Sequence, residues 1–162
     1  MGPVLTAGSW NLTTYLLDST VLIEWLRGRP EIEATMLHLV GAGHSLGTTC
    51  VNLAEVEAGL GQRERQTAAA VLGRLRFLAT EREAAHRAGR YQDEWAGRGI
   101  TIQMPDALVA GTARAHDAVL VTHNADDFPM SDVRVVHPRE AASAPVGPRG
   151  AHAQRRPSVG RK

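Results

Sequence analysis

Short apolar runs alternate along the chain with segments in which apolar residues recur at helical spacing. The run Tyr15–Leu17 is typical of a buried strand. A helix is predicted over Val21–Leu26, with Ser19 and Thr20 as its capping residues. Much later in the chain, Ala118–Thr122 is a second clear buried strand. The chain therefore mixes strands with helices from its first ordered element.

The rest of the pattern repeats this alternation. Further helices are predicted over Glu31–Val40, Asn52–Gly61, Glu64–Leu78, Ala79–Gly97 and Asp106–Ala115. Short strands are expected over His44–Cys50 and Ile100–Ile102, with an edge strand over Val133–Val136. Strands alternating with helices favour the α/β class, with a central, mostly parallel sheet of four or five strands covered on both faces.

Length and local composition divide the chain into three parts. Its 162 residues fit one domain. We expect an irregular N-terminal extension over residues 1–13 and the folded domain over residues 14–140. From Ala141 onward Ser, Ala, Pro, Gly and Arg dominate and large apolar side chains are rare. We therefore predict a disordered basic tail over residues 141–162.

Charge and hydropathy exclude some classes of protein. The formal net charge is +1, so a nucleic-acid partner has to be argued from local features. No apolar run is long enough to span a membrane, and the N-terminus lacks the features of a secretory signal, so a cytoplasmic protein without membrane contact is expected. The single cysteine, Cys50, lies in an apolar stretch and is predicted to be a small core residue.

Acidic residues follow or approach the ends of the predicted strands. Asp18 comes directly after the first strand, and Asp106 opens a helix just beyond Ile100–Ile102. The polar turn 124–127 follows the strand Ala118–Thr122, and Glu55 lies within a predicted helix. Each acid alone has an ordinary explanation as a helix cap or as a partner of the helix dipole. Together they point to one edge of the sheet, because ligands of parallel sheets bind at the carboxyl ends of strands.

Carboxylates that gather at one edge need a cation, because like charges a few ångströms apart repel. Hard divalent ions with oxygen ligands suit such a cluster, and the absence of organised His or Cys ligands argues against zinc. We therefore expect Mg²⁺ or Mn²⁺ as the cofactor. Such an ion can activate a water molecule and stabilise charge on a phosphate group.

Three segments of the sequence resemble the motifs of one family. YLLDSTVLIEWLRG resembles the opening of a PIN domain, in particular of the VapC-type toxins of bacterial toxin–antitoxin pairs. TTCVNLAEVEAGL resembles the second motif, and PDALVAGTARAHDAVLVTHNADDF resembles the third and fourth together. The resemblance spans Thr14 to Val136. It implies a PIN-like three-layer α/β/α fold and a metal-dependent endoribonuclease that hydrolyses RNA phosphodiesters with a metal-activated water.

The resemblance also implies site residues. Asp18, Glu55 and Asp106 match the three core metal-site acids of the family, with catalytic and metal-binding roles. The fourth position stays open between Asn124, as a metal ligand through water, and Asp127, as a further catalytic acid. Asp126 is a weaker candidate. The hydroxyl groups expected to support the site are those of Ser19, Thr20 and Thr122.

Partners follow from the same resemblance. It implies a structured RNA substrate such as a tRNA, a homodimer, and a cognate antitoxin protein that wraps the toxin and plugs the acidic pocket. The helices Val21–Leu26 and Glu31–Val40 are expected to form part of the antitoxin groove, with Trp25 suited to partner binding. The basic or titratable side chains considered for RNA contact or proton transfer are Arg27, Arg63, Arg65, Arg114, His116 and His123.

Other functions compete with this interpretation. A non-catalytic RNA-binding or interaction module of the same fold is one, although all three core acids are present. A DNA-directed nuclease of the same family is another. A phosphatase with an aspartate nucleophile would need a second Asp two residues after Asp18, where this chain has Thr20.

Overall fold

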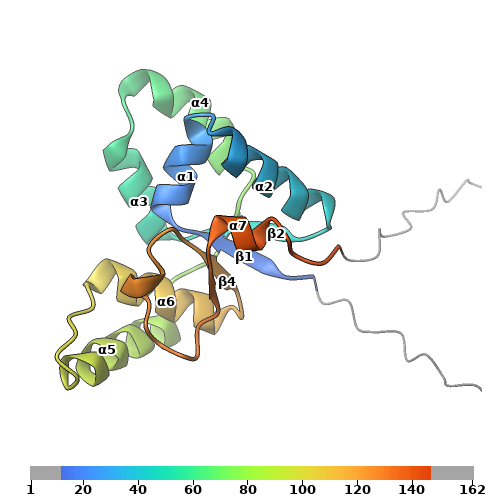
Figure 1. The fold of residues 1–162 in the computed structure, drawn as a ribbon. Coiled ribbons are helices and arrows are strands. Elements are labelled where there is room, and N and C mark those ends of the chain that lie inside the picture. The colour runs from blue at the N-terminus through green and yellow to red at the C-terminus, as the bar shows by residue number, and fades with distance from the viewer. Residues whose placement is uncertain (1–11, 147–162) are drawn as a thin grey trace, which may run out of the picture.

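Five parallel strands form the centre of the molecule, which the computed structural model describes over residues 12–146 (Figure 1). The strands are β1 (Thr14–Leu17), β2 (Ser45–Thr48), β3 (Arg76–Phe77), β4 (Val119–Val121) and β5 (Val135–Val136), in the spatial order β3-β2-β1-β4-β5. All neighbouring pairs are parallel. The predicted parallel sheet of four or five strands is therefore confirmed, with five strands.

Helices form the crossovers between β1, β2, β3 and β4, as is usual for parallel strands. The helices of the domain are α1 (Ser19–Leu26), α2 (Pro30–Gly41), α3 (Cys50–Gly59), α4 (Gln62–Leu72), α5 (Arg82–Ala96), α6 (Met104–Ala115) and α7 (Pro138–Ala141), which follows β5. A 3₁₀ turn over Ala125–Asp127 follows β4. The short helix α7 was not predicted. Within residues 12–146, no helix combines the length and the apolar character needed to cross a membrane.

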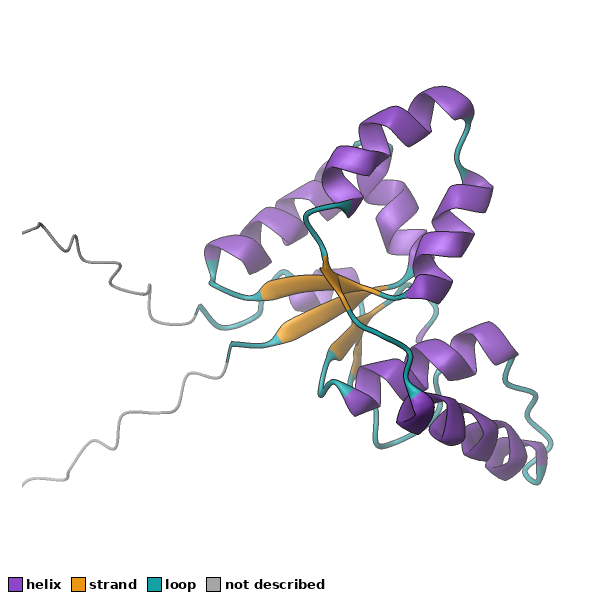
Figure 2. Ribbon diagram, turned by 180° about the vertical axis from the view of Figure 1, so that it is seen from behind, coloured by secondary structure: helices purple, strands orange, loops and turns teal. Residues whose placement is uncertain are grey.

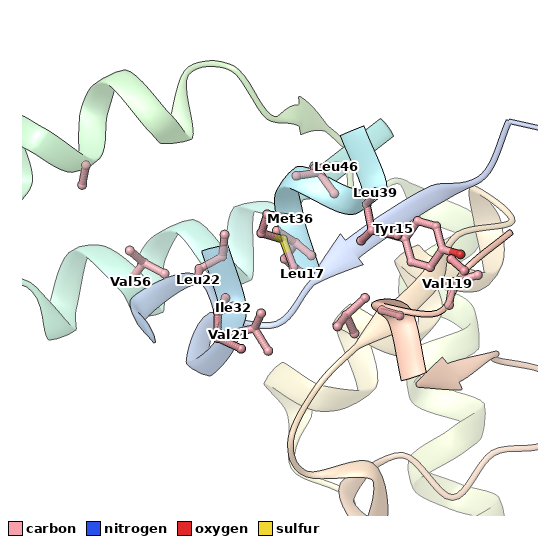
Figure 3. Close-up of a cluster of buried hydrophobic side chains, with 14 of the residues drawn as sticks. Tyr15, Leu17, Val21, Leu22, Ile32, Met36, Leu39, Leu46, Val56 and Val119 are labelled. Atoms are coloured by element: carbon pink, nitrogen blue, oxygen red, sulfur yellow. The ribbon is translucent and has the colours of Figure 1, made fainter. Parts of the chain in front are cut away.

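The two faces of the sheet carry separate hydrophobic cores, because successive residues of a strand point to opposite faces. Tyr15 and Leu17 of β1 belong to the core formed with α1, α2, α3, α4 and α7, part of which Figure 3 shows. Leu16 of β1 and Leu120 of β4 belong to the core formed with α5 and α6. The sheet therefore lies between two helical layers (Figure 2), which confirms the three-layer α/β/α fold.

Two predictions of secondary structure were wrong. The strand β3 lies inside the segment predicted as the helix Glu64–Leu78, because α4 ends at Leu72 and the chain then turns at Gly73 to join the sheet edge. Ile100–Ile102 forms no strand. This segment packs against the helices instead. The Ile102 carbonyl accepts a hydrogen bond from the Gln92 side chain (3.0 Å), and the Ile102 side chain is buried in the core formed with α5 and α6.

Two helix starts also differ from the predictions. The helix α1 already begins at Ser19, and Asp18 is its N-cap, with extended backbone angles and a carboxylate that accepts from the Ser19 N–H. Ser19 and Thr20 are therefore helical residues and not caps. Cys50 is exposed and not part of the core, because it is the first residue of α3, whose N-cap is Thr49.

The ends of the described chain pack onto the domain. The Thr13 carbonyl accepts from the Ser45 N–H (3.0 Å), which prolongs the pairing of β1 with β2. Ala141 and Ala144 are buried in the core that contains α2. The packed chain therefore continues past residue 141, where the tail was expected to begin. The remainder of the predicted extension and tail, residues 1–11 and 147–162, lies outside the described residues.

Candidate functional site

Asp18 stands at the carboxyl end of the central strand. It follows β1 directly, and its N–H donates to the carbonyl of Val121 at the end of β4 (3.0 Å). Thr122 follows β4 in the same way. The ladder between β1 and β4 thus brings Asp18 and Thr122 to the same edge of the sheet, although 104 positions separate them in the sequence.

Four donors surround the carboxylate of Asp18, which is only 8% exposed. Oδ1 accepts from the Ser19 N–H (2.9 Å) and the Asn52 amide (3.4 Å). Oδ2 accepts from the Thr122 hydroxyl (2.8 Å) and, at longer range, from the Thr20 hydroxyl (3.5 Å). These donors lie on both oxygens of the carboxylate. The Asp18 side chain is therefore held in one orientation.

Asn52 is a residue that the sequence reasoning missed. It is fully buried on α3, and its Oδ1 accepts from the Thr49 hydroxyl (2.7 Å). With Oδ1 occupied in this way, the amide Nδ2 is oriented to donate to Asp18. The sequence held a hint of this role. Asn52 lies three positions before Glu55 on the buried face of α3, and a buried polar side chain needs a polar partner.

Ser19 links Asp18 to the second acid. Glu55 projects from α3 and is exposed. The hydroxyl of Ser19 donates a short hydrogen bond to Glu55 Oε2 and also lies 3.4 Å from Asp18 Oδ1. The packing of α1 against α3 thereby brings together two acids that are 37 positions apart.

Asp106 lies in the first turn of α6 and is half-buried. Burial, together with the negative charges of Asp127, Asp18 and Glu55, raises the pKa of its carboxyl to about 6. Only acids that lie close to Asp106 can repel its charge appreciably. The four acids singled out from the sequence therefore form one electrostatic cluster.

The turn after β4 supplies the fourth acid. The Asn124 N–H donates to the Thr122 hydroxyl (3.0 Å), so this hydroxyl connects the turn to Asp18. The side chain of Asn124 is exposed, as are those of Asp126 and Asp127. Of the three acids whose charges raise the pKa of Asp106, Asp127 has the largest effect. Asp126 is not among them.

The donor set of the cluster suits a hard divalent ion, because carboxylate oxygens are the ligands that Mg²⁺ and Mn²⁺ prefer. Within residues 12–146, no group of three or more His, Cys, Asp and Glu side chains has the close spacing of a formed metal site. Carboxylates that face one another without a cation repel. The fit of an ion therefore rests on the donor chemistry and on the mutual repulsion that Asp106 experiences.

Several basic candidates have structural partners. Ion pairs join Arg27 to Glu64 (3.4 Å), Arg65 to Glu57 (3.4 Å) and Arg114 to Asp132 (3.7 Å). Arg114 also lies in the last turn of α6, at the opposite end from Asp106. The two histidines bond to protein groups, His116 to the Ala79 carbonyl (2.9 Å) and His123 to Glu24 (2.7 Å). These contacts favour structural roles for Arg114 and His116 in particular.

The raised pKa of Asp106 predicts that Asp106→Asn stabilises the metal-free protein at neutral pH. An acid with a raised folded-state pKa favours folding below its unfolded value of 3.8, and this contribution is lost as the pH rises through about 6. In EDTA at pH 8 the variant should gain roughly 1 kcal/mol after allowance for solvent screening, or about 2–4 °C in Tm. At pH 4 the gain should shrink toward zero. Thermal unfolding at both pH values measures it, and a variant less stable than the wild type at pH 8 would contradict the repulsion.

Comparison with known proteins gives consistent matches over this part of the chain. The family model of the PIN domain matches residues 15–134. Ribonuclease VapC10 of Mycobacterium tuberculosis is 33% identical over 71% of this chain and 86% of its own length, and Ribonuclease VapC19 of the same species is 27% identical over 71% and 92%. VapBC2 from Rickettsia felis, solved bound to a DNA fragment from its promoter, has a TM-score of 0.69 at 21% identity, over 77% of this chain and 98% of that chain. This structural likeness shows a shared fold.

Proposed function

Because the chain belongs to the PIN-domain family, we propose that it is a Mg²⁺- or Mn²⁺-dependent endoribonuclease and the toxin of a toxin–antitoxin pair. The family match and the VapC relatives make it a ribonuclease. The metal, the RNA and the partner are inferences from its residues. The observation that carries the proposal is the gathering of Asp18, Glu55, Asp106 and Asp127 at one edge of the sheet, where burial and the three neighbouring charges raise the pKa of Asp106.

Asp18, Glu55 and Asp106 would hold the ion, with Asp127 or a water on Asn124 completing the site. The larger influence of Asp127 on Asp106 favours Asp127 as the fourth group. A divalent ion at such a site lowers the pKa of a bound water and stabilises charge on a phosphate. The protein's own part is to hold these carboxylates in place, which the donors around Asp18 and the Ser19 bridge to Glu55 do.

The protonation of Asp106 links binding to pH. Below about pH 6 its carboxyl holds a proton in the metal-free protein and cannot serve as an anionic ligand. A neighbouring cation favours the charged form of a carboxylate, so metal binding should release this proton. The affinity for the ion should therefore rise as the pH increases through about 6.

The remaining parts of the proposal concern partners. We infer a structured RNA as substrate, from the resemblance to VapC-type toxins. An antitoxin partner is supported by the structures of similar fold, since one of them is a toxin–antitoxin complex from Klebsiella pneumoniae, with a TM-score of 0.62. We expect α1 and α2 to form part of the surface that an antitoxin binds, and we expect the protein to form a homodimer.

Cleavage assays on RNA and DNA test this proposal. The purified protein should cut tRNA in Mg²⁺ or Mn²⁺, leaving 5′-phosphate and 3′-hydroxyl ends, and should leave single-stranded DNA of matched length intact. EDTA should abolish cleavage, and excess Mg²⁺ should restore it, because the reaction needs the ion at the carboxylates. Cleavage that persists in EDTA contradicts the metal dependence. Binding of RNA without cleavage supports the non-catalytic alternative, and equal cleavage of DNA supports the DNA-directed one.

A further inference from the structure

The two ends of the described chain meet at His44. Nε2 of His44 lies 3.0 Å from the carbonyl of Pro145, and a carbonyl can only accept. Nε2 therefore carries the hydrogen, which leaves Nδ1 to accept from the N–H of Thr13 (3.3 Å). The segments 1–11 and 147–162 thus both join the domain beside the start of β2.

An apolar pocket opens beside this point. It has a volume of about 490 Å³ and lies between α1, α2, β2 and the end of α4. Its apolar lining consists of Trp25, Val40, Leu46, Val71 and Leu75, and His44 also lines it. Val40 is 57% exposed although it belongs to this lining. The pocket therefore presents large apolar side chains that another apolar group could cover.

We propose that the N-terminal segment 1–11 of this chain fills this pocket, with Trp10 as its anchor. Trp10 precedes Leu12 by two residues, which the chain spans with at most about 7 Å. Leu12 lies over Gly43, since a Cβ built on Gly43 would be 3.4 Å from Leu12 Cδ2. Gly43 is adjacent to His44, so the indole of Trp10 is within reach of the pocket.

Charge decides between the two chain ends. Residues 1–11 contain no Asp, Glu, Lys, Arg or His but include Val4, Leu5 and Trp10. Residues 147–162 contain five Lys and Arg side chains and one large aliphatic residue, Val159. The pocket also contains Arg74 and Arg76, which repel a basic segment. The uncharged N-terminal segment therefore fits it better than the basic C-terminal one.

Charge also favours this pocket over a second cavity near residue 12 as the docking site of the N-terminal segment. A second cavity of about 180 Å³ is lined by Leu12 and Thr13 themselves, on the other side of the chain. It contains Arg114, Asp117, Asp132 and Arg134, so it is polar. An indole gains more by covering apolar side chains than by displacing water from charged ones.

Docking of the segment has a consequence that rests on the proposed function. A partner that binds α1 and α2 would meet Trp10 in the same pocket and would have to displace it. The N-terminal segment would then weaken the binding of such a partner, and its removal would strengthen that binding.

Disulfide trapping in the full chain tests the docking. Ser9→Cys and Val71→Cys, in a Cys50→Ser background, place one thiol beside Trp10 and one on the far wall of the pocket. The control pairs Ser9→Cys with Arg114→Cys, which lines the polar cavity on the other side of Leu12. Under a mild oxidant the pocket pair should form an intrachain disulfide at least about tenfold faster than the control, because docking raises the effective thiol concentration.

Trp10→Ala added to the pocket pair should reduce its rate to that of the control. Equal rates for the two pairs, or a pocket pair that does not respond to Trp10→Ala, would overturn the proposal. A disulfide formed mainly between two chains would also overturn it, since the occupant would then be a second copy. In the otherwise unchanged chain, Trp10→Ala should lower Tm by about 2–4 °C, with Val146→Ala as an exposed apolar control that leaves Tm unchanged.

Discussion

Asp18→Asn is expected to lower the rate of RNA cleavage by at least about 100-fold while the fold stays intact. The substitution keeps the shape of the side chain but removes a negative charge that four donors orient. A metal ion contributes several kcal/mol of charge stabilisation to phosphoryl transfer, and each 1.36 kcal/mol corresponds to a tenfold change in rate. If Asp18 is a ligand of the proposed ion, its loss should cost about two orders of magnitude or more.

The matched control for Asp18→Asn is Asp93→Asn, which removes an equal charge from the exposed surface of α5. Cleavage of tRNA at saturating Mg²⁺ compares the two variants with the wild type, and near-ultraviolet circular dichroism reports their folds. Asp93→Asn should cleave at the wild-type rate. If Asp18→Asn does so as well, the acidic cluster is not the catalytic centre.

Gly111→Ala is expected to destabilise the fold strongly, because the added methyl group has no room between α5 and α6. A Cβ at Gly111 of α6 would lie 2.4 Å from the backbone carbonyl oxygen of Ala84 in α5. Backbone atoms cannot move aside as a flexible side chain can, so the two helices must separate. Overpacking of this kind costs about 3 kcal/mol, which lowers Tm by roughly 6–12 °C for a domain of this size.

Gly89→Ala is the control for this prediction, because it adds the same methyl group to α5 where no atom beyond the adjacent backbone of that helix lies within 4 Å. It should raise the free energy of unfolding by about 0.5–1 kcal/mol, since glycine weakens a helix interior relative to alanine. Urea unfolding of both variants measures the difference. Two changes of the same sign and size would show that α5 and α6 do not approach closely at Gly111.

The central strands could be predicted because they carry the strongest pattern. Tyr15–Leu17 and Val119–Val121 are unbroken apolar runs that end at Asp18 and Thr122, and both are buried on two faces. In a parallel sheet, such runs bring the residues that follow them to one edge. The placement of Asp18 beside Thr122 follows from this topology.

The edge formed by β3 could not be predicted in the same way, although the edge strand β5 lies within the predicted segment Val133–Val136. The strand β3 has only two residues, Arg76 and Phe77, and both are exposed. Their pairing depends on Gly47 of β2, where a Cβ would lie 3.3 Å from the Arg76 carbonyl, and on the burial of Leu78. These contacts join residues about 30 positions apart, so no local sequence pattern predicts them.

The contacts that orient the acids were also hidden. Asn52 reaches Asp18 across 34 positions, and the hydroxyl of Ser19 reaches Glu55 across 36. Sequence reasoning identified Ser19 as a supporting hydroxyl only through the family resemblance, and it did not identify Asn52. Both contacts depend on the packing of α1 against α3, which periodicity alone does not determine.

Titration of the protein with Mn²⁺ at pH 7.5, followed by isothermal calorimetry, is the most direct measurement of whether the four acids form a metal site. The wild type and Asp93→Asn should bind Mn²⁺, and Mg²⁺ should compete for the same site. Asp18→Asn and Asp106→Asn should each bind at least about tenfold more weakly, because each lacks one charged ligand. A wild type that binds no Mn²⁺, or variants that bind it as tightly as the wild type, would contradict the shared site.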